Sequence, residues 1–168
     1  MKTQNEYSYP IEKEHIQKIL TKESPAHRKY SDKNGTVYNL THAVDFLCKE
    51  GTPVKAALDG IVIKIINNLT KNYNKHEPPT EDILPITEQD GNYVLIKHSN
   101  EFSICSHLRP AGVLVKSGQN IKTGETIGYS GNTGWSIKPH LHFMVFKFLK
   151  PEPAKDLESL EVRWKESD

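Results

Sequence analysis

Cysteine is scarce in this sequence, long apolar runs are missing, and neither sign of charge is in excess. The two cysteines, Cys48 and Cys105, are too few and too far apart for a disulfide framework or a CxxC zinc site, so we expect both to be small buried hydrophobes. No stretch approaches the roughly 20 apolar residues of a membrane span, and the first residues lack the apolar core of a classical signal peptide. The formal net charge of +1 gives no electrostatic basis for binding nucleic acid or an anionic membrane.

The chain has 168 residues, of which 36% are hydrophobic and 26% charged. This length and composition are typical of one globular domain. From Asp45 onward, short apolar runs are separated by glycine, proline and asparagine turns, which is typical of antiparallel strands. Two units, GTPVKAALDGIV at 51–62 and KSGQNIKTGETIG at 116–128, share a strand-turn-strand outline built on glycine. The sequence therefore predicts a mainly β fold, an antiparallel β-sandwich or flattened barrel of interlocked glycine-turn hairpins.

The β domain is expected to cover residues 37–150 and to follow an N-terminal extension, residues 1–36. Within that extension, isoleucine and leucine recur with helical spacing between Ile11 and Leu20, which predicts a short helix. Residues 67–91 are polar, broken by proline and too long for a hairpin connection, so we interpret them as an insertion between two strands. The insertion is either a wall of a groove or a plain loop.

Residues 151–168 are predicted to be a charged C-terminal tail. Helical spacing recurs weakly in it from Lys155 to Leu160. Trp164 is expected to tuck this tail onto the body of the domain.

The segment PHLHFMVF places His140 and His142 on either side of Leu141. Successive side chains of an extended strand alternate between its faces, so both imidazoles point to one surface while Leu141 points into the core. Two histidines on a solvated strand face would give the same pattern. Two imidazoles on one face can also hold a metal ion, and the rest of the chain favours that interpretation.

Three further groups could converge with this pair: His42 and Asp45 in LTHAVDF, and His107 in SHLRP. A hydrolytic zinc centre uses three protein ligands from His, Asp or Glu and leaves one position for water. That water needs a base to take its proton, and the oxyanion that follows needs a donor. The chain has enough histidines for all these tasks. Three others are expected to be solvated or turn residues rather than ligands: His15, His76 and His98.

Four segments follow one another within residues 45–145: GTPVKAALDGIV, NYVLIKH, SHLRPAGVLVKSGQNIKTGETIGYSGNTGWS and PHLHF. Their order resembles that of the LytM and lysostaphin type of zinc endopeptidases, which cut peptide cross-links in bacterial cell walls. The resemblance implies a β-sandwich with Zn²⁺ at the floor of a narrow groove. It also implies that Asp45 and His142 are zinc ligands. In the same family pattern His107 and His140 would be the catalytic histidines, acting as general base and oxyanion donor.

The first motif departs from the family pattern HxxxD, in which histidine and aspartate share one face of a strand. This chain has Thr41 at the histidine position and His42 only three residues before Asp45, and residues three apart on a regular strand face opposite ways. We expect a bulge or turn to bring His42 round as the third zinc ligand. The alternatives are that His27 or Asp32 replaces it, or that the metal site is incomplete.

The GNTGWS turn leads into the HxH strand. It is either the wall of a groove or a purely structural turn, and the residues concerned are Asn132, Thr133, Gly134 and Ser136. Trp135 either floors a substrate groove or anchors the turn.

The leading hypothesis is a metalloendopeptidase that hydrolyses peptide bonds in peptidoglycan with a zinc-activated water, and we expect it to act as a monomer. The resemblance also implies that the substrate has small residues at the cleaved bond and that the enzyme acts outside the cell or in its envelope. The alternative is an inactive module of the same fold that binds cell wall or activates a hydrolase, which the altered His42 spacing favours. A third possibility is a carrier or phosphotransfer domain, since biotinyl and sugar-phosphotransferase domains have similar hairpins. Those domains need one exposed lysine or one phosphorylated histidine, rather than HxH with a carboxylate.

Overall fold

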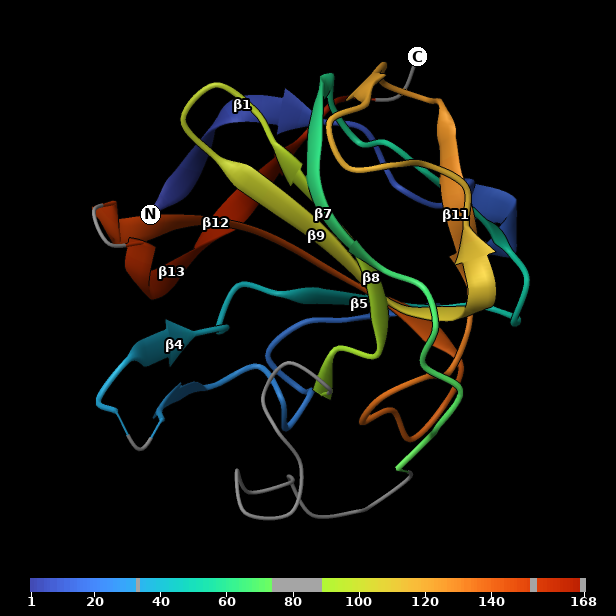
Figure 1. The fold of residues 1–168 in the computed structure, drawn as a ribbon, viewed down its shortest axis with the longest axis horizontal. Coiled ribbons are helices and arrows are strands. Elements are labelled where there is room, and N and C mark those ends of the chain that lie inside the picture. The colour runs from blue at the N-terminus through green and yellow to red at the C-terminus, as the bar shows by residue number, and fades with distance from the viewer. Residues whose placement is uncertain (33, 74–88, 152–153, 167–168) are drawn as a thin grey trace.

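The computed structural model describes residues 1–32, 34–73, 89–151 and 154–166 (Figure 1). Its elements, in chain order, are β1 (Lys2–Tyr7), the 3-10 turn η1 (Lys13–His15), β2 (Lys18–Leu20), β3 (Lys29–Ser31), β4 (Val37–Asn39), β5 (Val44–Leu47), β6 (Pro53–Lys55), β7 (Gly60–Ile66), β8 (Asn92–Lys97), β9 (Phe102–Val113), β10 (Asn120–Ile121), β11 (Thr126–Ser130), β12 (His140–Pro151) and β13 (Ala154–Trp164). Within these ranges no helix has the length and apolar character needed to cross a membrane.

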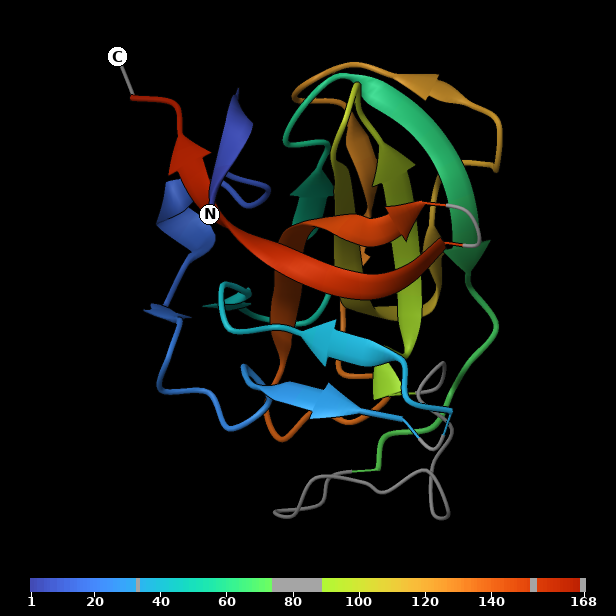
Figure 2. The ribbon, with the colours of Figure 1, turned by 90° about the vertical axis from the view of Figure 1, so that its left-hand side faces the viewer.

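The strands form one extensive hydrogen-bonded sheet with the main order β10-β7-β8-β9-β12-β13-β4-β3. Figure 2 shows β13 lying between β12 and β4, with β3 beyond them. Strands β1, β2, β5, β6 and β11 branch from this path, and β5 pairs with the beginning of β12. The predicted mainly β fold is confirmed.

The two glycine-turn units pair with each other as interlocked hairpins. β6 of the first unit pairs with β11 of the second, and β7 of the first pairs with β10 of the second. Gly118 and Gly124 have φ of +86° and +85°, the left-handed conformation that glycine adopts without a steric penalty. Both units are therefore strand-turn-strand hairpins, as their shared outline in the sequence predicted.

The helix expected between Ile11 and Leu20 is not formed, and that prediction was wrong. The segment contains the η1 turn and then β2, which pairs antiparallel with β5. Ile11 is fully buried whereas Ile19 is 40% exposed, so the apolar side chains do not share one face. The Gln17 N–H donates to the Leu47 carbonyl at 2.8 Å, so a neighbouring strand takes a donor that a helix would use internally.

The C-terminal segment is also a strand and not the weak helix expected from Lys155 to Leu160. β13 pairs antiparallel with β12 and parallel with β1 and β4. Trp164 at its end stacks on Tyr9 with ring centroids 4.8 Å apart and also packs edge-on against Phe46 at 5.9 Å. The expectation that Trp164 holds this segment to the body is confirmed.

The insertion connects β7 to β8, as expected, and Lys71 to Tyr73 and Gln89 to Gly91 belong to its two described ends. Residues 74–88, which include His76, lie outside the described residues. Cys48 and Cys105 are both buried and free, as the sequence predicted.

The core fixes the face on which the histidines lie. Leu141 and Phe143 of β12 are fully buried in the main hydrophobic cluster. Since side chains alternate along a strand, His140 and His142 project from the other face. The alternation predicted from PHLHF is therefore present.

Candidate metal centre

Asp45 and His142 face each other across two paired strands. β5 and β12 are antiparallel, with Asp45 directly opposite His142, and opposite residues of such a pair share one face of the sheet. His142 Nδ1 lies 2.9 Å from Asp45 Oδ1, and each residue is only 5% exposed. Strand register thus brings together two of the residues expected as metal ligands.

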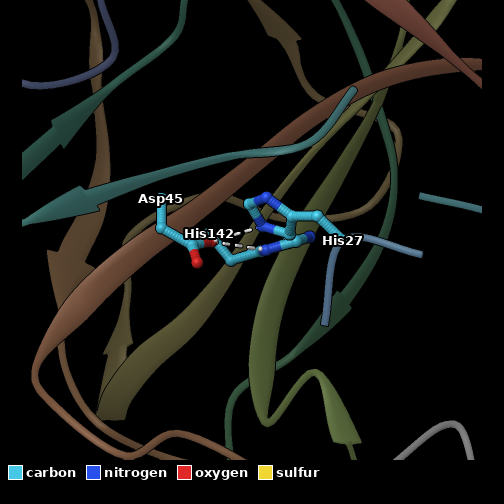
Figure 3. Close-up of side chains that lie close together, drawn as sticks. All are labelled: His27, Asp45 and His142. Atoms are coloured by element: carbon cyan, nitrogen blue, oxygen red, sulfur yellow. Dashed lines mark hydrogen bonds and ion pairs between the residues drawn. The ribbon is translucent and has the colours of Figure 1, made fainter. Parts of the chain in front are cut away.

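His27 approaches the same carboxylate from the loop between β2 and β3 (Figure 3). Its Nε2 lies 3.1 Å from Asp45 Oδ1. Its backbone N–H donates to the Ser24 carbonyl at 3.0 Å, and its Nδ1–H donates to the Thr21 carbonyl. Because Nδ1 faces a carbonyl oxygen it carries the proton, so the Nε2 lone pair is directed at Asp45.

The structure does not bring His42 to this group. Its backbone N–H donates to Ser159 Oγ at 3.0 Å, and it lies in the turn before β5, which begins only at Val44. The strand therefore starts too late for a bulge to bring His42 round. The place expected for His42 is taken by His27, one of the two upstream alternatives. Asp32, the other, accepts backbone N–H groups of its own turn.

In the part of the chain that the structure describes, one group of side chains could hold a metal ion: His27, Asp45 and His142. The ligand atoms of these three residues all lie within 4.8 Å of one another. Two imidazole nitrogens and a carboxylate oxygen are the donors of a typical hydrolytic zinc site. An imidazole lone pair facing a carboxylate oxygen is favourable only when a proton or a metal cation lies between them. The residues present therefore fit zinc.

The electrostatics of the pair also favour a cation. Burial alone would raise the pKa of Asp45, but the hydrogen bond from His142 and the charges of His142 and His140 hold it well below its usual range. Burial alone would lower the pKa of His142, but its hydrogen bond to Asp45 and the charge of that carboxylate raise it. A proton and a metal ion would compete for the same nitrogen of His142, so metal affinity at this group would depend on pH.

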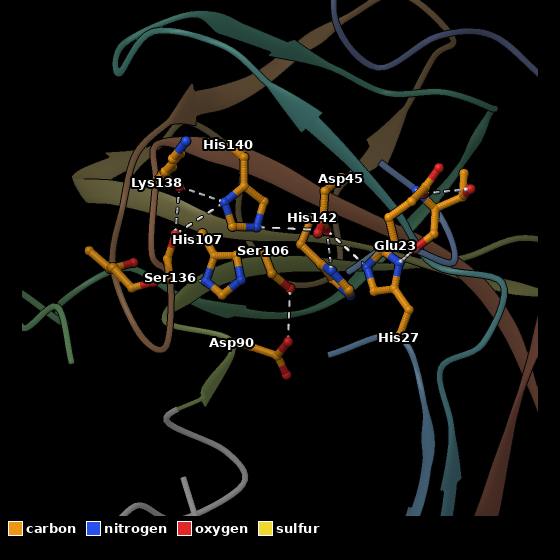
Figure 4. A network of polar contacts seen from close by, with 12 residues as sticks. Glu23, His27, Asp45, Asp90, Ser106, His107, Ser136, Lys138, His140 and His142 are labelled. Atoms are coloured by element: carbon orange, nitrogen blue, oxygen red, sulfur yellow. Dashed lines mark hydrogen bonds and ion pairs between the residues drawn. The ribbon is translucent and has the colours of Figure 1, made fainter. Parts of the chain in front are cut away.

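His140 lies beside this group (Figure 4). Its Nε2 is 3.7 Å from Asp45 Oδ1. Its Nδ1 is 2.7 Å from the Lys138 carbonyl oxygen and 3.1 Å from Ser136 Oγ. The carbonyl oxygen requires a proton on Nδ1, so His140 also directs a bare Nε2 toward the site.

His107 completes the cluster on the side of His140, with ring centroids 4.7 Å apart. Its Nδ1–H donates to the Thr133 carbonyl at 2.8 Å, and its backbone N–H donates to the Asp90 carbonyl at 2.8 Å. Its φ of +63° is rare for a residue with a Cβ, and the register between β8 and β9 shifts at this point. Such a bulge re-aims one side chain, here the ring of His107 toward the HxH strand.

Burial lowers the pKa of both His107 and His140, and for His107 the neighbouring histidines lower it further. Both rings are therefore neutral at pH 7 and able to accept a proton. The structure brings the two expected catalytic histidines together.

Asp90 and Ser106 were not identified from the sequence. Ser106 Oγ donates to Asp90 Oδ1 at 3.1 Å, and Ser106 lies directly opposite His142 on β9. Burial raises the pKa of Asp90. No periodicity marks Asp90, because it stands at the end of the insertion and reaches the site only through the pairing of β8, β9 and β12.

A groove runs over the cluster. Its floor contains Asp45, His107, His140 and His142. Its other lining residues come from β2 and the following loop, from the end of β5 and from the turn before β12; they are Lys18, Leu20, Glu23, Ser24, Pro25, Ala26, Leu47, Trp135, Ser136, Ile137 and Lys138. Ser136 and Trp135 thus line the groove, as one interpretation of the GNTGWS turn expected.

The family model described as peptidase family M23 matches residues 39–153. The chain belongs to peptidase family M23. The resemblance read from its motifs is thereby confirmed. The match covers Asp45, His107, His140 and His142 but begins after His27, which explains why family spacing does not point to that histidine.

Two named relatives show what this M23 chain is similar to. It is 34% identical to the peptidoglycan DD-endopeptidase ShyA of Vibrio cholerae over 71% of this chain and 21% of that protein. It is 35% identical to the glycyl-glycine endopeptidase ALE-1 of Staphylococcus capitis over 61% of this chain and 23% of that protein. The chain thus spans about a fifth of the length of these relatives.

Solved structures agree on the M23 fold. A zinc-containing peptidase from Vibrio cholerae superposes with a TM-score of 0.59 and 26% identity, covering 98% of this chain and 40% of that one. The catalytic domain of lysostaphin from Staphylococcus simulans superposes with a TM-score of 0.52 and 26% identity, covering 83% of this chain and 86% of that one.

Proposed function

We propose that this M23 chain is a zinc-dependent endopeptidase that hydrolyses peptide bonds in bacterial cell-wall peptides. The observation that supports this most strongly is the meeting of His27, Asp45 and His142 on one side of His107 and His140. Three metal donors and two neutral histidines beside them are the groups that metal-assisted peptide hydrolysis requires.

The zinc ligands would be Nε2 of His27, the carboxylate of Asp45 and Nδ1 of His142. Zinc bound there supplies a Lewis acid that polarises the scissile carbonyl and makes an attacking water acidic. Thr21 keeps the proton of His27 on Nδ1, so that Nε2 remains a donor.

His107 and His140 would handle the proton. Each directs a bare Nε2 toward the site because a backbone carbonyl holds its Nδ1–H. One ring accepts the proton of the attacking water, and a protonated ring then donates to the oxyanion or the leaving amine. Lowered pKa values keep both rings ready as acceptors at neutral pH.

The cell-wall substrate is proposed from the relatives, whose names specify peptidoglycan or glycyl-glycine cleavage. Small residues at the cleaved bond, action in the cell envelope or outside the cell, and a monomeric state belong to the same proposal.

The test combines metal analysis with cleavage. We expect one zinc per chain, cleavage of cross-linked cell-wall peptides, and loss of both activity and metal in His142→Ala. A chelator should abolish cleavage and added zinc should restore it. A wild-type protein that binds wall fragments but holds no zinc and cleaves nothing would overturn the proposal in favour of a binding module. In this proposal His27 supplies the third donor, so the altered His42 spacing does not favour that alternative.

A further inference from the structure

The two proposed catalytic histidines depend on backbone oxygens from one short segment. His107 Nδ1–H donates to the Thr133 carbonyl at 2.8 Å, and His140 Nδ1–H donates to the Lys138 carbonyl at 2.7 Å. Both oxygens lie in residues 131–138, named here the carbonyl turn, between β11 and β12 (Figure 4). The tautomer of each ring therefore depends on where the carbonyl turn holds its oxygens.

The carbonyl turn is held from outside by both ends of the insertion. At the first end, Tyr73 N–H donates to the Gly134 carbonyl and Gly134 N–H donates to the Lys71 carbonyl, each at 2.9 Å. At the second end, Trp135 N–H donates to the Gln89 carbonyl at 2.9 Å.

Glycine permits this close contact. Gly134 has φ of +77°, and a Cβ placed there would collide with the backbone of Gly91. The carbonyl turn therefore packs directly on the backbone of the insertion, without side chains between them.

One side chain of the insertion bridges the carbonyl turn. Asn72 Nδ2 donates to the Asn132 carbonyl and, at 2.8 Å, to the Ser136 carbonyl. Asn132 immediately precedes Thr133, whose oxygen holds His107. Ser136 lies two residues before Lys138, and its hydroxyl donates to the Lys138 carbonyl at 2.8 Å. Both N–H groups of one amide thus brace the turn near the two oxygens that hold the histidines.

We propose that Asn72 is a positioning residue that keeps Nδ1 of His107 and His140 protonated and Nε2 bare. The proposal rests on the proposed function only in treating these rings as proton acceptors. Without the Asn72 amide, the carbonyl turn can move from its present position, and a ring that loses its carbonyl partner also populates the tautomer protonated on Nε2. A ring in that form cannot accept a proton from a water in the groove.

The test compares Asn72→Ala and Asn72→Asp with the wild type in the zinc-loaded protein. Asn72→Asp keeps the shape of the side chain but has no N–H to donate, and Asn72→Ala removes the group without adding charge. We expect kcat to fall about 10- to 100-fold, with KM and the zinc dissociation constant within about threefold of wild type. Nitrogen-15 NMR of the histidine rings should show one Nδ1–H tautomer for His107 and His140 in the wild type and mixed tautomers in the variants.

Asn39→Ala is the matched control. It also truncates an amide, whose Nδ2 donates to Glu158 at 3.1 Å, but it does not touch the carbonyl turn. Its ring tautomers and kcat should match the wild type. Unchanged tautomers in both Asn72 variants would overturn the inference even if the wild type is an active peptidase. An inactive wild type whose tautomers still shift on Asn72→Ala would sink the proposed function and leave the positioning role standing.

Discussion

At the scale of single residues, His27 is held by its surroundings in an orientation suited to metal binding. The Thr21 carbonyl takes its Nδ1–H, and the Ser24 carbonyl takes its backbone N–H. The lone pair on Nε2 consequently faces the carboxylate of Asp45 at 3.1 Å. A flexible surface histidine would lose this alignment and with it most of the benefit of a third donor.

The first prediction separates His27 from His42. His27→Ala should weaken zinc binding by more than about 100-fold, beyond the range seen when a residue that only supports a ligand is removed. His42→Ala should leave the zinc dissociation constant within about threefold of wild type, because His42 lies outside the metal group. Competition with a chromogenic chelator measures both constants. The reverse result, with zinc lost only in His42→Ala, would contradict the ligand set.

A second residue-scale prediction concerns His98, which lies in the turn between β8 and β9, one of the two settings expected for it, but is only 7% exposed. Its Nδ1–H donates to the Asp59 carbonyl at 2.7 Å and its Nε2 accepts from Ser103 Oγ at 2.9 Å, so the folded protein holds it neutral. Burial lowers its pKa. The unfolded chain takes up a proton at about pH 6.5 while the folded ring stays neutral. This histidine therefore reduces folding stability as pH falls below that value.

His98→Gln should lower the free energy of unfolding by about 1–2 kcal/mol at pH 7.5. Between pH 7.5 and 5 the variant should lose less stability than the wild type, because one group that gains a proton on unfolding is gone. Urea unfolding at several pH values measures this. His15→Gln, on the exposed η1 turn, is the control and should follow the wild type. If the free energy of unfolding depends on pH in the same way for His98→Gln and wild type, protonation of His98 on unfolding is ruled out as the cause.

At the scale of elements, β12 organises the site. Its first residues pair with β5 on one side and with β9 on the other, so His142 has Asp45 on one flank and Ser106 on the opposite flank. Its later residues pair with β13. A strand bonded along both edges moves little, which keeps the HxH pair aligned with ligands from distant parts of the chain.

A buried carboxylate joins the N-terminal strand β1, which also pairs with β13, to the turn before β9. Glu101, 2% exposed, accepts from the Gln4 N–H, from Asn5 Nδ2 at 2.9 Å and from the Tyr7 hydroxyl at 2.9 Å. Glu101→Gln should lower the free energy of unfolding by about 2–3 kcal/mol, because an amide presents N–H groups to donors. Chemical denaturation measures the loss.

Glu161→Gln, on β13, is the matched control because its carboxylate also contacts β1. Its carboxylate pairs with Lys2 at 3.8 Å, and both side chains are more than half exposed. Glu161→Gln should change the free energy of unfolding by no more than about 0.5 kcal/mol. Equal losses in Glu101→Gln and Glu161→Gln would show that burial of Glu101 is unimportant.

At the scale of the whole molecule, the metal group joins three separate segments: the loop carrying His27, strand β5 and strand β12. These segments meet only in the folded chain, so zinc held by this group would bind the folded state preferentially. Free zinc at 100 times its dissociation constant should raise the free energy of unfolding by about 2.7 kcal/mol. Urea curves in zinc and in chelator measure this difference, which should vanish in His142→Ala. Identical curves for the wild type would contradict a zinc site.

Much of the fold was predictable because it depends on local pattern. Apolar runs between glycine turns predicted the interlocked hairpins, and the family order of motifs predicted Asp45, His107, His140 and His142 as neighbours. The N-terminal helix was wrong because isoleucine spacing between Ile11 and Leu20 matches a helix by coincidence. The extended conformation of this segment is instead set by backbone pairing with β5, the strand that ends at Leu47.

The sequence by itself determined the two-residue alternation that buries Leu141 and turns His140 and His142 to one face, because side-chain direction along a strand is set by adjacent residues. Only the tertiary structure decided that His27 joins Asp45 and that carbonyls of Thr133 and Lys138 orient the other rings. Those contacts depend on how loops far apart in sequence pack together. No local period encodes the approach of one loop to another.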